Sequence, residues 1–176
     1  MAKEKNGRRR FIQYPHETRC DARAILKAEL STGFIVGVRF SGNLLNSTSV
    51  EIRHLDSGSV IRTTAPKDNG GDGSQFSPTD LCAASLAACA STVMGMAAQK
   101  SGFSITVTFS LEKEMQLNPR KIEKIKVDYQ ISGASTQAQK DICEHAGRNC
   151  PVRLTLGDNV EIQESYFFVG QESVAT

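Results

Sequence analysis

Two of the chain's cysteines occupy positions where a thiol could do redox chemistry. Cys89 lies in the middle of an alanine-rich run, and Cys150 directly precedes Pro151. The Cys-Pro step predicts that Cys150 caps a short helix, where unsatisfied N–H groups and the helix dipole lower the pKa of a thiol. Cys89 has no such help from its own helix, so a thiolate there would need a neighbouring cation, and arginine suits this role because it stays protonated. Without a further signal, either cysteine is a buried packing residue.

The other cysteines show no pattern of a metal or disulfide site. They are Cys20, Cys82 and Cys143. A total of five cysteines is odd, which argues against a secreted disulfide scaffold. There is no C-x-x-C pair, and His16, His54 and His145 do not have zinc-ligand spacings relative to the cysteines. We therefore expect no metal and no cofactor. Cys82 and Cys89 share a helix face about two turns apart, which is too far for a disulfide within one helix.

Length and charge indicate one globular domain. The chain has 176 residues and a net charge of +2, which gives no strong field for nucleic acid. No apolar run reaches the roughly 20 residues of a membrane helix. Basic residues cluster within residues 3–10 without a following apolar segment, so a secretory signal is not expected. We predict a partly mobile N-terminal extension over residues 1–33, a single domain over residues 34–176, and a cytoplasmic protein without membrane or nucleic-acid partners.

Alternating apolar residues predict strands on both sides of a long helix. Ser77 is a good N-cap, Pro78 suits the first helical position, and Gly102 ends the helix after about Lys100. The hairpin signal Asp56-Ser57-Gly58 joins two of the strands. A helix capped by Ser135 or Thr136 runs to Arg148, and a short one follows Cys150. The expected strands and the remaining helix are Ile35–Phe40, Val50–Leu55, Val60–Thr64, Ile105–Leu111, Ile125–Ile131, Val160–Val169, and a helix over Thr18–Leu30.

Two separated motifs resemble the OsmC/Ohr family. Residues 76–89 read FSPTDLCAASLAAC and continue to TVMGM at 92–96, which resembles the family's first-cysteine helix. Residues 149–152 read NCPV, which resembles its second-cysteine motif, and the NGG loop at 69–71 also fits. Both motifs occur in the family's order, so the resemblance is specific and covers about residues 40–170.

The resemblance implies an α+β fold in the order βββαββααβ, with antiparallel sheets around a long central helix in an intertwined homodimer. It also implies a thiol-dependent peroxidase of the stress response that reduces organic hydroperoxides, and hydrogen peroxide less well. In such an enzyme Cys89 becomes a sulfenic acid, Cys150 closes a disulfide with it, and a dithiol reductant, such as a lipoyl group on a protein, restores both thiols.

The supporting residues of the family are an arginine that holds the thiolate and a carboxylate that orients the arginine. For the arginine we select Arg62, with Arg53 as the alternative. Family peroxidases carry Glu directly after the helix-opening proline, where this chain has Thr79, and the carboxylate follows as Asp80. Asp80 is therefore a candidate for this role, although its position also suits a helix cap.

Two other function classes are open on the sequence. The shifted carboxylate is compatible with a non-catalytic redox sensor or a small-molecule binding protein on the same fold. A nucleic-acid-binding module would rest only on the basic residues at the start of the chain. Chemistry of the Cys89 thiol separates the first alternative from the peroxidase, since only a catalytic thiol reacts fast with peroxide.

Overall fold

The computed structural model describes residues 37–170, and the residues from Arg39 onward form one compact unit. The helix expected at Thr18–Leu30 and the basic cluster at residues 3–10 lie outside the described residues. The elements are β1 Phe40–Asn46, β2 Ser49–His54, β3 Val60–Thr64, the short 3-10 helix η1 Lys67–Asn69, α2 Pro78–Lys100, β4 Thr106–Leu117, β5 Arg120–Ser132, α3 Gln137–Arg148, α4 Pro151–Leu156, η2 Gly157–Asn159 and β6 Glu161–Val169. Within the described residues this order is the predicted βββαββααβ.

The first sheet is an antiparallel meander in the order β1-β2-β3. Its β2-β3 turn contains Gly58 with a φ of 73°, a left-handed conformation that favours glycine and confirms the hairpin signal. The expected position of the first strand, Ile35–Phe40, is wrong, since the strand begins at Phe40 and residues 37–39 are not in a strand. The reason is the tight turn before β2, in which Asn46 Oδ1 accepts a hydrogen bond from the Thr48 backbone at 2.9 Å. In the register that this turn sets, Phe40 pairs with His54, the last residue of β2, so residues 37–39 have no partner on that strand.

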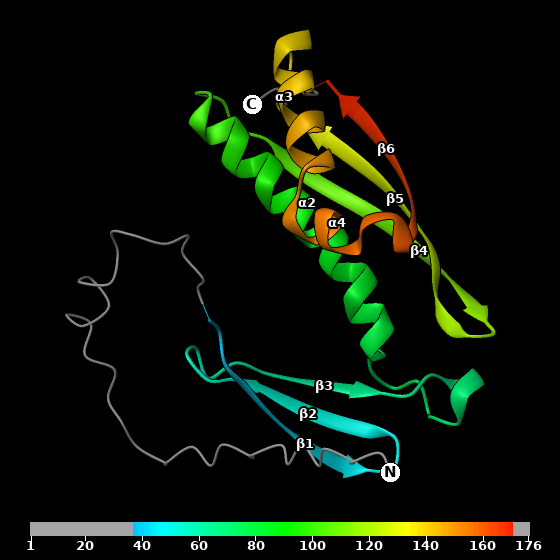
Figure 1. Ribbon diagram of the computed structural model, residues 1–176. Coiled ribbons are helices and arrows are strands. Elements are labelled where there is room, and N and C mark those ends of the chain that lie inside the picture. The colour runs from blue at the N-terminus through cyan, green and yellow to red at the C-terminus, as the bar shows by residue number, and fades with distance from the viewer. Residues whose placement is uncertain (1–36, 171–176) are drawn as a thin grey trace, which may run out of the picture. The chain divides into compact units, whose positions relative to one another are not determined.

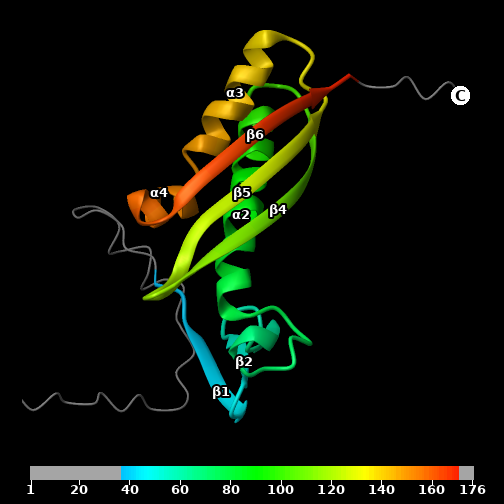
Figure 2. The same cartoon turned by 90° about the vertical axis from the view of Figure 1, so that its right-hand side faces the viewer.

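The second sheet has the order β4-β5-β6 (Figure 2). The strands expected at Ile105–Leu111 and Ile125–Ile131 are longer in the structure and pair as the antiparallel hairpin β4-β5 around Asn118 and Pro119. β6 runs parallel to β5, so the expectation of purely antiparallel sheets does not hold for this pair. The cause is the connection through α3 and α4, because a crossover that includes helices returns the chain in the same direction.

Helix α2 begins with a capping box. Ser77 Oγ accepts from the Asp80 backbone at 3.1 Å, and the Asp80 carboxylate accepts from the Ser77 backbone at 2.7 Å. Among the described residues, α2 is one helix that is long and apolar enough to cross a membrane by length and composition. Its Ala83, Leu86 and Met94 are fully buried, however, which identifies it as the core helix of a packed domain.

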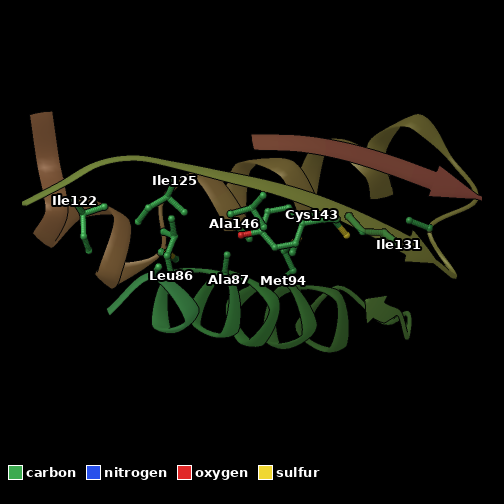
Figure 3. Packing of buried hydrophobic residues seen from close by; sticks show 14 residues of the cluster. Leu86, Ala87, Met94, Ile122, Ile125, Ile131, Cys143 and Ala146 are labelled. Carbon is green, nitrogen blue, oxygen red and sulfur yellow. The ribbon is translucent and has the colours of Figure 1, made fainter. Parts of the chain in front are cut away.

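The core lies between α2, α3 and one face of the second sheet (Figures 1 and 3). Leu86, Ala87 and Met94 of α2 point toward Ile125 and its neighbours on β5 (Figure 3). The odd-numbered residues of β5 from 125 to 131 are buried, whereas the residues between them are partly or fully exposed. This alternation gives the sheet one packed face and one polar face.

Replacement of Leu86 by Ala tests this core. Leu86 is 0% exposed, so the loss of its buried methyl groups should lower the free energy of unfolding by about 3 kcal/mol. The matched control is Leu117→Ala at a site that is 67% exposed, where the loss should be under about 1 kcal/mol. Urea unfolding followed by circular dichroism measures both values. Equal losses would show that α2 does not pack as described.

Candidate active site

The two cysteines selected from the sequence meet in the structure. Cys89 projects half-buried from the middle of α2, and Cys150 is fully buried at the N-cap of α4. Both are free thiols. Cys89 packs against the buried cluster that contains Cys150, and the nearby Cys89 raises the pKa of the Cys150 thiol, so the two side chains lie close to each other. The more accessible sulfur is therefore the one that a reagent from solvent reaches first.

Cys150 lies in an environment that favours its protonated form. Burial raises the pKa of the Cys150 thiol, and the nearby Cys89 and Glu164 raise it further. The Arg153 backbone N–H donates to Cys150 Sγ at 3.4 Å and lowers the pKa, more than Cys89 or Glu164 alone raises it but less than burial does. The expectation that a helix N-terminus lowers the pKa of Cys150 is therefore wrong in its net direction, because desolvation outweighs the single hydrogen bond.

A buried polar cluster lies beside Cys150, and the sequence analysis missed it. Arg153 of α4 donates from Nε to Glu164 Oε2 at 2.9 Å, and the Glu164 side chain is only 1% exposed. The rings of Tyr129 and Tyr166 stack with centroids 5.1 Å apart. The charges of Glu164 and Cys150 both act on the two tyrosines, so these groups share one site. The sequence signal was Glu164 at an inward position of the alternating strand β6.

Burial also determines the protonation of the two tyrosines. Desolvation, followed by the charge of Glu164, raises the pKa of Tyr129 and of Tyr166 far above the usual range. Both hydroxyls therefore stay protonated at all physiological pH values. A β-carbon at Gly147 would lie 2.8 Å from the Tyr166 hydroxyl, so the glycine in α3 permits this close approach.

Asp80 lies at the start of α2, nine residues before Cys89, which corresponds to about 13 Å along the helix axis. Its carboxylate caps the helix and forms an ion pair with Lys113 of β4, whose side chain is 14% exposed. Lys113 also donates to Thr79 Oγ1 at 2.9 Å. Burial raises the pKa of Asp80, but the hydrogen bonds from Lys113 and Ser77 together outweigh it and lower the pKa.

The two candidate arginines lie in the first sheet. Arg62 of β3 pairs with Glu51 at 2.9 Å and is 64% exposed. Arg53 of β2 donates to the Gly58 carbonyl at 3.1 Å. Among the described residues, Arg153 is an arginine next to one of the two cysteines, since its backbone N–H contacts Cys150 Sγ and Cys150 raises its pKa. The structure thus brings Cys89 and Cys150 together and places Arg62 and Asp80 in other contacts.

Among the described residues, the remaining cysteines and Met94 occupy packing positions, whereas Met96 does not. Cys143 of α3 is buried, and burial raises the pKa of its thiol. Cys82 is half-buried against the core, about two helical turns before Cys89. Met94 is a core residue, whereas Met96 is 65% exposed. Cys20 lies outside the described residues.

Fold and paired thiols together define the class of this protein. The chain belongs to the OsmC-like family, whose model matches residues 71–165, more than half of the chain. No curated protein sequence matches it. The predicted family and α+β fold class are thus confirmed.

Solved structures have the same fold. A Psychrobacter arcticus protein proposed to act in the osmotic stress and detoxification response is 26% identical, with a TM-score of 0.67 over 78% of this chain and 99% of that chain. An organic hydroperoxide resistance protein from Elizabethkingia anophelis is 17% identical, with a TM-score of 0.61 over 78% of this chain and 100% of that chain. One from Legionella pneumophila is 20% identical, with a TM-score of 0.56 over 77% and 99%. At these identities the last two show the fold alone.

Asp80→Asn tests the structural role of this carboxylate. Since the pKa of Asp80 is lowered on folding, the ion pair stabilises the protein above the unfolded pKa of about 3.9 and is lost as the pH falls through the folded value. The side chain is 38% exposed, so solvent screens the ion pair. We therefore expect the substitution to lower the free energy of unfolding by only about 1 kcal/mol at pH 7, and by less below pH 4. Urea unfolding at several pH values measures it, with Asp56→Asn in an exposed turn as the control. A cost that does not change with pH would contradict the assignment.

Proposed function

We propose that the protein is a thiol peroxidase that reduces organic hydroperoxides, and hydrogen peroxide less well. The observation that supports this best is that the half-buried Cys89 packs against the buried cluster that contains the Cys150 thiol. Family membership and the hydroperoxide resistance proteins among the structures of the same fold support the same class of substrate.

The proposed reaction divides between the two sulfurs. The Cys89 thiolate attacks the terminal oxygen of the peroxide, the O–O bond breaks, and an alcohol leaves once its oxygen is protonated. Cys89 is then a sulfenic acid. Cys150 attacks this sulfur, the S–O bond breaks, water is released and a disulfide forms. A dithiol reductant, possessing two thiols in reach of each other, restores both cysteines by exchange and is itself oxidised to a disulfide.

We propose Arg62 as the cation that stabilises the Cys89 thiolate, with Arg53 as the alternative. Both arginines lie in the first sheet, and Arg62 already carries a carboxylate partner in Glu51. An arginine oriented by a carboxylate matches the pairing that the family resemblance implies. Asp80 stays a candidate orienting group, in addition to its cap and its contact with Lys113.

We also propose that the protein works as a homodimer. Apolar side chains that a monomer would leave in water support this, among them Phe40 at 61%, Leu44 at 70% and Met96 at 65% exposure. Phe40 and Leu44 lie on β1, a strand of the first sheet, and Met96 lies on α2, the helix that contains Cys89. A second copy would cover them and could bring the arginine of one chain to the thiol of the other.

One observation favours the non-catalytic alternative. The carboxylate of Asp80 is already engaged by its helix cap and by Lys113, and Thr79 occupies the position of the family's glutamate. A redox sensor with this site would react with peroxide once and slowly. A peroxidase would turn over many times in the presence of a dithiol.

Turnover separates these functions. We expect the reduced protein to consume cumene hydroperoxide in the presence of dihydrolipoamide, and Cys89→Ser to abolish consumption because the nucleophile is absent. In the absence of the dithiol, Cys150→Ser should consume about one equivalent and then stop with a dimedone-reactive Cys89. Cys143→Ser, a change at a buried thiol of α3, is the matched control and should retain turnover. Wild-type consumption at the buffer rate would rule out the peroxidase.

The two arginines provide a matched pair of variants. If Arg62 holds the Cys89 thiolate, Arg62→Gln should lower kcat/KM for the hydroperoxide by about 100-fold, because a fixed charge next to the reacting sulfur is lost. Arg53→Gln should change it less than about twofold. Initial rates at low substrate concentration measure both. The reverse order of effects would move the assignment to Arg53, and two small effects would exclude both residues.

A further inference from the structure

Glu164 is a charged residue on the face of β6 whose other side chains, Ile162 and Tyr166, pack against the core. β6 pairs in parallel register with β5, and Glu164 lies opposite Val127, between Ile162 opposite Ile125 and Tyr166 opposite Tyr129. These three residues of β5 are buried, so Glu164 faces the helices. Burial of a carboxylate lowers the stability of the folded protein unless the carboxylate is paired. Residues that are retained despite this loss of stability are often functional.

The carboxylate is only half satisfied. Its Oε2 accepts from Arg153, whereas Oε1 is buried and accepts no hydrogen bond from the described residues. The hydroxyls of Tyr129 and Tyr166 are likewise buried without a hydrogen-bond partner among these residues. The negative charge of Glu164 reaches the Cys150 thiol and disfavours its ionisation. A free carboxylate oxygen thus lies in the same buried cluster as a thiol that must lose its proton to react.

We propose that Glu164 is the base that takes the proton of Cys150 when Cys150 attacks Cys89, and that Arg153 is the residue that positions this carboxylate. The proposal rests on the proposed function, since it assigns a residue to the disulfide-forming step. Arg153 links the two partners, because its side chain holds Glu164 and its backbone N–H contacts Cys150 Sγ.

The proton and the electrons balance within the cluster. Cys150 starts as a thiol, and its proton passes to Glu164 as its sulfur forms the S–S bond with the Cys89 sulfenic acid. The S–O bond of the sulfenic acid breaks, and the departing hydroxide receives the proton that Glu164 took from Cys150, which gives water. Glu164 then returns to the carboxylate. The peroxide consumed in the previous step is the oxidant, so no further reagent is needed.

Closure of the disulfide is measured separately from the reaction with peroxide. Reduced full-length protein is mixed with one equivalent of cumene hydroperoxide, quenched with acid at timed intervals and alkylated. Mass spectrometry then quantifies two forms of Cys89, the sulfenic acid as its dimedone adduct and the disulfide. Glu164→Gln preserves shape and a hydrogen-bond acceptor for Arg153 but is not a base. We expect sulfenic acid to form at the wild-type rate and disulfide closure at pH 7 to slow about 100-fold.

The pH profile distinguishes a base from a structural residue. The titratable groups around Cys150 are Cys89 of α2, Arg153 of α4, Tyr129 of β5, and Glu164 and Tyr166 of β6, with Arg148 of α3 over the Tyr166 ring. With the base present, closure should be nearly constant from pH 6 to 8. In Glu164→Gln it should rise about tenfold per pH unit, because it then depends on the small fraction of Cys150 thiolate.

The controls separate failure of this inference from failure of the proposed function. Glu161→Gln removes an exposed carboxylate of β6 that pairs with Lys124, and it should close at the wild-type rate. The double variant Arg153→Gln/Glu164→Gln leaves no unpaired charge, and it replaces Glu164→Gln in the experiment if that single variant does not fold. Its disulfide should close as slowly as we expect for Glu164→Gln. A second arm forms a mixed disulfide on Cys89 with 4,4′-dithiodipyridine and follows release of the second thiopyridone by Cys150, which needs no peroxide.

Slow, pH-dependent closure in both glutamine variants supports the inference. Wild-type closure rates, or a wild-type pH profile, in the variants of either arm overturn it. Absence of both sulfenic acid and disulfide in the wild-type protein after peroxide overturns the peroxidase, and the dithiodipyridine arm then still decides whether Glu164 is the base for Cys150.

Discussion

The candidate site depends on the close approach of α4 to the middle of α2. Cys89 can lie beside Cys150 only because the turns of α2 around it carry small side chains, and Ala83, Ala87 and Ala90 are fully buried there. A larger residue at these positions would hold neighbouring backbones apart. The capping box at Ser77 fixes where α2 begins, and Pro151 fixes where α4 begins, so the positions of both sulfurs along their helices follow from local signals.

Burial then gives the two thiols different properties. Cys89 is partly accessible from solvent, whereas Cys150 is fully buried in the core cluster that contains Tyr129, against which Tyr166 stacks. Desolvation keeps Cys150 protonated, so its chemistry depends on the groups that share its cluster. The pair of Arg153 and Glu164 brings one charge of each sign into that cluster at no net charge. Two identical side chains thus come to occupy one open and one closed environment.

Much of this arrangement could be predicted from the sequence, and the rest required tertiary structure. The helix over Pro78–Lys100 and the hairpin at Asn118-Pro119 follow from caps and alternation, which are local. The direction of β6 does not follow, because alternation identifies a strand without orienting it. The pKa of Cys150 depends on desolvation by distant segments, so the local helix signal gave the wrong direction. Glu164 was overlooked because its partner Arg153 lies on another element.

The central claim is that peroxide joins Cys89 to Cys150. Reduced protein exposed to limiting hydroperoxide, alkylated, digested without reduction and mapped by mass spectrometry tests it most directly. The account predicts one cross-linked species that joins the peptides of Cys89 and Cys150, with Cys20, Cys82 and Cys143 alkylated. A different pairing, or full alkylation of both Cys89 and Cys150, would contradict it.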